Sequence, residues 1–111
     1  DAAGSNDTPG VNNKFLVPAP GRLINVFVRS TLAGGNTNIA FHRASDGDAN
    51  LNTTAVETVS INIASNNTSY VAAFSPAADF MTGDIVGISI DPTNQPNDVN
   101  ITCVWEFDLT A

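Results

Sequence analysis

The sequence has few residues that could form a reactive site, a disulfide or a metal site. It contains one cysteine, one histidine and only four basic residues among 111. A single cysteine excludes a disulfide within the chain and leaves no pair of thiolates to hold a zinc ion. Four bases against eleven acids give a net charge of −7, so the basic cluster that holds a nucleic-acid backbone is missing. Stability must therefore come from packing or from association of chains, and nucleic acid is not expected as a partner.

Long apolar runs are also missing. No stretch approaches the ~20 residues of a membrane-spanning helix, and the first residues lack the basic start and apolar run of a signal peptide, so no membrane contact is expected. With 42% hydrophobic and 14% charged residues, the composition fits one globular domain. Residues 1–13 are rich in Gly, Asn and Asp and nearly free of large apolar residues. We therefore predict a polar N-terminal arm at 1–13 followed by a folded domain at 14–111.

What the chain does have is a series of short apolar segments with turn residues between them. A Pro-Ala-Pro-Gly turn separates a short apolar piece from a β-branched run at 23–32. Later segments that alternate or are continuously apolar lie at 37–43, 53–63, 68–74, 85–90 and 101–109. No helical periodicity is present over a useful length. Roughly seven or eight strands of this kind predict an all-β fold, namely a single antiparallel β-sandwich, jelly-roll-like, with an extended N-terminal arm.

The last segment, ITCVWEFDL, holds the only cysteine and the only tryptophan. Strand alternation places Cys103 and Trp105 on the buried face and points Glu106 outward. A cysteine beside a tryptophan in a core is usually a small hydrophobic residue. A nucleophilic thiol needs a histidine to lower its pKa, and His42 falls on the polar phase of its strand, which we expect to face outward. We therefore interpret Cys103 as structural.

One loop has the spacing of calcium ligands. Asp46, Asp48, Asn50 and Glu57 occupy what would be the first, third, fifth and twelfth positions of a calcium loop. The sixth position, a glycine in such loops, is Leu51, and the flanking segments are strands rather than helices. Two interpretations follow: a weak calcium site, or a hairpin turn with Glu57 on a solvated strand face. The missing glycine favours the turn, and no other metal or cofactor is predicted.

Three aspartates lie near the ends of one predicted strand, and paired carboxylates of this kind hydrolyse glycosides when they face each other across a cleft. They are Asp79, Asp84 and Asp91. Aspartate is also a turn residue, and Asp84 follows Gly83 while Asp91 precedes Pro92. A structural role in turns is the simpler interpretation, and we predict no catalytic residue.

Other residues suggest binding rather than catalysis. Tyr70, His42 and Arg43, if exposed, would suit a sugar, but the six phenylalanines and the tryptophan fall mainly in apolar phases and are interpreted as core. Gly87 lies inside an apolar strand, where a glycine often marks a bulge or the close approach of another backbone. Gly87 and Trp105 are therefore our candidates for contact between chains, although the Trp105 ring can equally pack within the core.

Three stretches carry a family resemblance when taken together: PAPGRLINVFVRSTL, FMTGDIVGISIDPTNQPNDVN and TCVWEFDL. They resemble small jelly-roll virion proteins of tailed bacteriophages, of the capsid decoration (cement) or fibre-tip type, including those of phages of marine bacteria and cyanobacteria. The resemblance spans about residues 18–109. A Gly-Asp pair before a strand is also similar to trimeric jelly rolls of the tumour necrosis factor and complement C1q type.

The resemblance implies a non-enzymatic protein of the virion surface, commonly a homotrimer, that binds other virion proteins. It would cap capsid symmetry axes or form a fibre tip that touches the host, with a host-surface glycan as a further partner. Residues 1–13 would then lie across the capsid or a neighbouring subunit, or join a fibre shaft. The alternative is an extracellular carbohydrate-binding or adhesin β-sandwich module. An enzyme has the least support, because no pair of residues combines the chemistry with the spacing.

Overall fold

The computed structural model describes residues 14–45, 51 and 54–110, which form eight β-strands. The strands are β1 (Lys14–Leu16), β2 (Gly21–Ser30), β3 (Gly35–Ala44), β4 (Glu57–Ile63), β5 (Thr68–Ala73), β6 (Asp79–Phe80), β7 (Ile85–Pro92) and β8 (Asn100–Phe107). These residues contain no helix, and hence none that would cross a membrane. The predicted polar arm at 1–13 lies outside the described residues.

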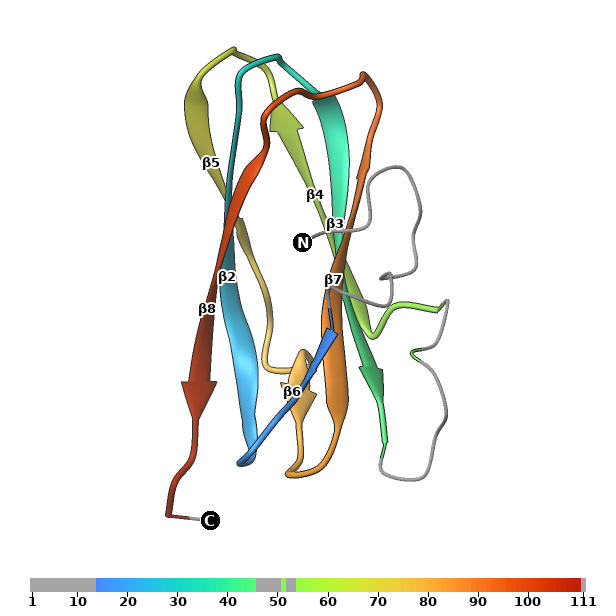
Figure 1. Ribbon diagram of the computed structural model, residues 1–111, viewed down its shortest axis with the longest axis vertical. Coiled ribbons are helices and arrows are strands. Elements are labelled where there is room, and N and C mark those ends of the chain that lie inside the picture. The colour runs from blue at the N-terminus through green and yellow to red at the C-terminus, as the bar shows by residue number, and fades with distance from the viewer. Residues whose placement is uncertain (1–13, 46–50, 52–53, 111) are drawn as a thin grey trace.

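The strands build two antiparallel sheets that pack face to face (Figure 1). Sheet A has the order β1-β7-β3-β4. Sheet B is centred on β2, which pairs with β8 along one side and with β5 and the short β6 along the other. The predicted all-β class and the single antiparallel sandwich are confirmed.

Strand β2 shows how a segment rich in apolar residues is divided between two faces. Leu23, Val26 and Val28 are fully buried, whereas Phe27 is exposed. The register with β8 shifts between Leu23 and Asn25, which marks a bulge that adds one residue to β2. That added residue lets Leu23 and Val26 face the same side although three positions separate them. From Asn25 to Arg29 the alternation is regular, with Val26 and Val28 inward and Asn25, Phe27 and Arg29 on the other face.

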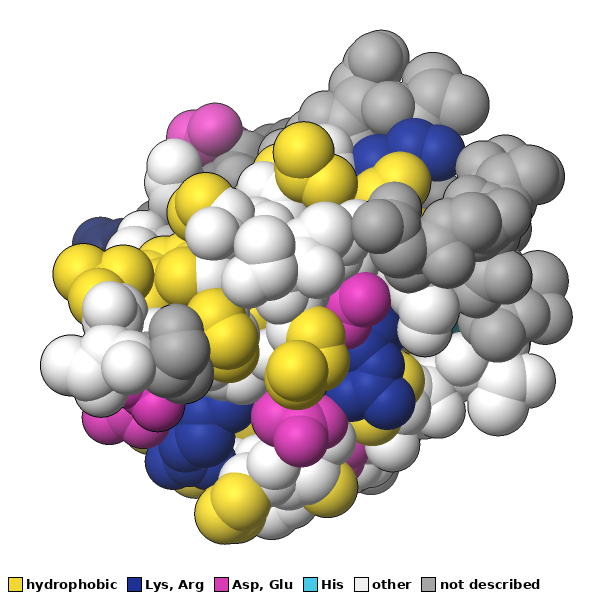
Figure 2. All heavy atoms as spheres, turned by 90° about the horizontal axis from the view of Figure 1, so that it is seen from below, with side chains coloured by type: hydrophobic (Ala, Val, Ile, Leu, Met, Phe, Trp, Pro, Cys, Tyr) yellow, Lys and Arg dark blue, Asp and Glu magenta, His cyan; other side chains and the backbone are white. Residues whose placement is uncertain are grey.

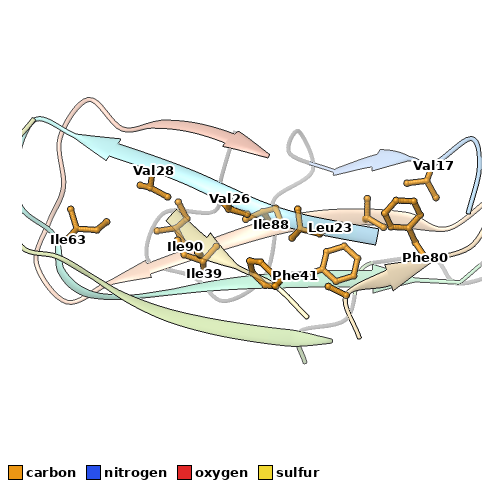
Figure 3. Packing of buried hydrophobic residues seen from close by; sticks show 14 residues of the cluster. Val17, Leu23, Val26, Val28, Ile39, Phe41, Ile63, Phe80, Ile88 and Ile90 are labelled. Carbon is orange, nitrogen blue, oxygen red and sulfur yellow. The ribbon is translucent and has the colours of Figure 1, made fainter. Parts of the chain in front are cut away.

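The core lies between the two sheets (Figure 3). Side chains of β3 and β7 from sheet A meet those of β2 from sheet B, and Phe80 fills one end. The buried cluster consists of Val17, Leu23, Val26, Val28, Ile39, Phe41, Ile63, Ala72, Phe74, Ala78, Phe80, Val86, Ile88 and Ile90. Burial of these apolar side chains is the main force that holds the sheets together.

The two long sides of the sandwich close differently. On one side β4 lies beside β5, so the backbones of the two sheets approach each other. On the other side the Phe15 and Trp105 rings, from β1 and β8, meet edge to face with centroids 5.1 Å apart. Trp105 also contacts Phe41 at 6.3 Å and Phe80 at 5.8 Å. Trp105 is only half-buried because β8 is an edge strand, but it points inward as predicted.

Candidate functional site

The position of His42 differs from the prediction. Its side chain is fully buried, whereas the polar phase of the strand predicted an exposed one. His42 does lie on the outer face of sheet A, but this face is covered around it, since Ala40, Ala44 and Ser89 are also buried. The prediction was wrong because the alternation of a strand assigns a residue to a face of the sheet and says nothing of what covers that face.

The imidazole of His42 is hydrogen-bonded to a serine on the neighbouring strand. Its Nε2 lies 2.8 Å from Oγ of Ser89 in β7, across the β3–β7 ladder. A hydroxyl beside an imidazole is the pair that nucleophilic catalysis employs. Both side chains are at most 1% exposed, so no substrate reaches the hydroxyl in this structure. The geometry supports a structural role, in which the two groups satisfy each other's hydrogen-bonding capacity.

Cys103 lies on the inward face of β8, at the margin of the core. Burial raises the pKa of the Cys103 thiol, so the sulfur stays protonated at neutral pH and is a weak nucleophile. His42 is on the outer face of sheet A, so the sheet itself separates it from this sulfur. The geometry agrees with the interpretation of Cys103 as a small hydrophobic residue.

Only one of the four candidate calcium ligands can be placed. Asp46, Asp48 and Asn50 lie outside the described residues. Glu57, at the start of β4, accepts hydrogen bonds from the backbone N of Ser75 at 2.9 Å and from its Oγ at 2.7 Å. Within the described part of the chain, no three His, Cys, Asp or Glu side chains come together as metal ligands. Glu57 therefore holds the segment before β6, and calcium binding stays a prediction.

The aspartates serve local structure at two of the three positions. Asp84 is buried, and its Oδ2 accepts a hydrogen bond of 2.8 Å from the backbone N of Met81, while Gly83 beside it has φ = 92°. This is the turn role that the sequence indicated. Asp79 forms an ion pair with Arg43, with 2.7 Å between Oδ1 and Nη1. Asp91 is exposed within β7.

The residues considered for sugar binding do not share a surface. Tyr70 lies on β5 and packs partly into the core, and its hydroxyl oxygen accepts a hydrogen bond of 3.0 Å from the backbone N of Ser65. His42 and Arg43 belong to β3 in the other sheet, where His42 is buried and Arg43 pairs with Asp79. This set of three residues therefore builds no sugar site.

The two candidates for contact between chains already have neighbours within their own chain. Gly87 is buried in β7, opposite Lys14 of β1 on one side and His42 of β3 on the other. The backbones that approach this glycine are therefore its own sheet neighbours. Trp105 packs against three phenylalanines, as described above. Contact of either residue with a second chain stays a prediction.

A surface that the sequence did not reveal lies on the outer face of sheet B. Phe27 is 43% exposed at the centre of this face and stands directly opposite Val71 of β5, which is 47% exposed. Val104 of β8 is diagonal to Phe27 on the same face, because Phe27 pairs with Thr102. The interpretation of Phe27 as core was wrong. We call Phe27, Val71 and Val104 the apolar stripe.

A second group of exposed apolar residues lies at the end of the sandwich where β8 finishes. Leu16, Met81 and Leu109 are each about two-thirds exposed or more. Seen from that end, apolar side chains are interspersed with acidic and basic ones (Figure 2). Arg22 and Glu106 form a loose ion pair of 3.9 Å nearby. Single apolar residues among charges are common on protein surfaces, so this end is a weaker candidate for binding than the apolar stripe.

Comparison of the chain with protein-family models, with curated proteins and with solved structures finds no match. The likeness to phage virion proteins therefore rests on the three sequence segments alone.

Proposed function

We propose that this chain is a non-enzymatic structural protein of a bacteriophage virion surface, where it decorates the capsid or forms a fibre tip through contacts with other proteins. The resemblance over about residues 18–109 is the reason for the virion assignment. The exposed apolar stripe is the observation that supports action through protein contact. It places an aromatic and two branched aliphatic side chains next to one another on one face of a sheet.

The free energy gained by burying the apolar stripe suits a contact that many copies of the chain make on one particle. Full burial of a Val or Phe side chain stabilises by about 1.5–3 kcal/mol, and roughly half of each stripe residue is still exposed, so we expect about 1 kcal/mol from each. Such a contact is weak for one copy. Many copies on one particle act together, because each bound neighbour raises the effective concentration of the next.

The engagement of the polar side chains supports the non-enzymatic part of the proposal. His42 and Ser89 are bonded to each other in a buried position. The carboxylate of Glu57 is bonded to Ser75, and that of Asp84 to a turn backbone. In the described part of the chain these groups serve the fold: the His42–Ser89 pair is buried, and the exposed Glu57 carboxylate accepts hydrogen bonds from Ser75.

A carbohydrate-binding module is the second candidate, and one observation favours it. The exposed ring of Phe27 has Arg29 two residues further along the outer face of β2 and Thr102 opposite on β8. An aromatic ring stacks on the apolar face of a pyranose while polar groups bind its hydroxyls. The valines that flank the ring favour a protein partner instead, because their methyl groups offer no hydrogen bond to a sugar.

The proposal is tested by locating the chain on particles. An antibody raised against the purified protein is applied to tailed phages from marine and cyanobacterial lysates, and gold-labelled particles are viewed by electron microscopy. Label on heads or on fibre tips supports the proposal and distinguishes its two forms. Label restricted to cell surfaces or to the secreted fraction contradicts it.

The carbohydrate alternative is tested on a glycan array with the wild-type protein and Phe27→Ser. Binding that Phe27→Ser abolishes supports the alternative. Val71→Ser is the matched control, because Val71 is similarly exposed on the same face but offers no ring for stacking. Absence of binding by the wild type removes the observation in favour of a sugar.

A further inference from the structure

The outer edge of β8 is a sheet edge without a neighbour among the described residues. β8 pairs with β2 on one side only. The backbone N of Asp108 donates a hydrogen bond of 2.7 Å to O of Pro20, which continues the β2–β8 ladder past the strand end. Backbone groups alternate in direction along an antiparallel strand. The N–H and C=O groups of the even-numbered residues of β8 therefore point toward β2, and those of the odd-numbered residues point away.

Four residues of β8 thus direct backbone donors and acceptors to the outside, where no other described strand pairs with them: Ile101, Cys103, Trp105 and Phe107. Proteins usually protect such an edge with charges, proline or a very short strand. β8 has none of these protections near its centre: it is eight residues long, contains no proline, and carries its only charge at Glu106.

The other outermost strands are less suited to pairing with a further strand. β1 is three residues long, and β5 is six residues long and lies beside β4. β4 places Ser60 and Asn62 on its outer face and starts at Glu57, whose carboxylate is bonded to Ser75. β8 is therefore the longest outermost strand in the described part of the chain, and it carries apolar side chains on both of its faces.

We propose that β8 pairs in antiparallel orientation with β8 of a second copy of this chain across a two-fold axis. The axis passes beside Val104, so that Val104 faces the partner's Val104. Cys103 then pairs with the partner's Trp105, and Ile101 with the partner's Phe107. This register uses the outward backbone groups of all four odd-numbered residues and keeps the outer faces of both copies on the same side of the joined sheet.

Charge and apolar surface both agree with this register. Glu106 faces the partner's Thr102, so no two carboxylates stand opposite each other although each chain has a net charge of −7. Val104 and Phe107, each 37% exposed, become covered. Phe27 of the two copies then lies on either side of the central valine pair, which joins the two apolar stripes into one surface. Two-fold pairing predicts an even number of chains in place of the trimer that the family resemblance implies.

The first test is the native mass in solution, measured by light scattering over a range of concentrations. The wild type is expected to have the mass of two 11.5 kDa chains at high concentration. Val104→Lys places two ammonium groups beside the axis, and we expect it to weaken association at least tenfold. Val71→Lys is the matched control: Val71 is at least as exposed on the same face but lies on β5, at the opposite side of the sheet from the β8 edge, and the dimer should persist.

The second test fixes the register with a disulfide. Opposed residues of a non-hydrogen-bonded antiparallel pair have Cα atoms about 4.5 Å apart, a separation that a disulfide spans. Val104→Cys combined with Cys103→Ser should form a covalent dimer on mild oxidation. Val71→Cys combined with Cys103→Ser should stay a single chain. Circular dichroism verifies that all four variants keep their β-structure, and the cross-link remains informative if Val104→Lys fails to fold.

A native mass of one chain or of three chains overturns the proposal, as does a dimer that survives Val104→Lys or cross-linking that is equal at positions 71 and 104. These outcomes are independent of the virion role. Label on phage particles together with a monomer would leave the proposed function standing and reject the β8 pairing. Pairing without any label on particles would do the reverse.

Discussion

The outer faces of the two sheets have opposite environments although both follow the same alternation of residues. On sheet A the outward residues His42 and Ser89 are polar and buried, while on sheet B the outward residues Phe27, Val71 and Val104 are apolar and exposed. Polarity and exposure are therefore reversed relative to the usual pattern. Alternation determines which side of a sheet a residue occupies, and the rest of the molecule determines whether that side is exposed to solvent.

The two sheets also differ in regularity. The β3–β7 ladder of sheet A runs without interruption, whereas the β2–β8 ladder of sheet B contains the bulge after Leu23 and an unusually close approach at Gly21. A Cβ atom on Gly21 would lie 1.9 Å from the carbonyl O of Glu106. Because the atom in the way belongs to the backbone, a rotamer change cannot relieve the contact. Sheet B therefore depends on one position where only glycine fits.

The largest expected effect on stability comes from a substitution that disrupts sheet B at Gly21. Gly21→Ala should destabilise the protein by about 4 kcal/mol, because β8 must move away from β2 to admit the methyl group. Urea unfolding followed by circular dichroism measures the loss. Gly34→Ala is the matched control, since its Cβ would meet nothing closer than 3.5 Å, and a loss of similar size there would contradict the explanation.

The next effect sharpens the contrast between the faces. His42→Ala should cost about 2–4 kcal/mol, because it leaves a buried cavity and removes the hydrogen-bond partner of Ser89. Phe27→Ala on the exposed face should cost only about 1 kcal/mol, although it removes more atoms. Midpoints and slopes of urea unfolding curves give both values. Equal losses would mean that the two faces do not differ in environment.

A smaller difference separates two hydroxyls on sheet A. Ser89→Ala should cost about 1–3 kcal/mol, because His42 then keeps a buried nitrogen with one bond fewer. Ser60 on β4 also has a bonded hydroxyl, which donates to Oδ1 of Asn38, but both groups are exposed. Water replaces that bond, so Ser60→Ala should cost about 0.5 kcal/mol or less. Thermal unfolding of the two variants in parallel distinguishes them.

The smallest expected effect is the pH dependence of stability that Cys103 causes at the half-buried margin of sheet B. Burial raises the pKa of Cys103 in the folded protein, so the unfolded thiol, which ionises near pH 8.5, loses its proton first. The unfolded state then binds fewer protons, and the stability of the wild type falls as the pH rises above that value. Relative to Cys103→Ala, the wild type should lose stability between pH 7 and pH 10. A constant difference between the two proteins would contradict the shift.

The sequence predicted more of the fold than of the candidate surface. The alternating segments identified the long strands, the inward direction of Cys103 and Trp105, and the turn at Asp84. Phe27 was misassigned because its type and its neighbours Val26 and Val28 are apolar, although Asn25 and Arg29 share its phase and indicate an outward side chain. His42 was misassigned because the covering of a sheet face depends on contacts between distant parts of the chain. The β8 edge was missed because a strand carries no local mark of whether it lies at the centre or at the edge of a sheet.

By itself the sequence determined the local structure: which segments are strands and which residues turn between them. These properties follow from the steric preferences of each residue and of its immediate neighbours. Only the tertiary structure decided that β8 lies beside β2 with one edge open, that His42 is buried and that Phe27 is exposed to solvent. The backbone groups of a strand can bond to any other strand, and the choice among them depends on how all the side chains pack at once.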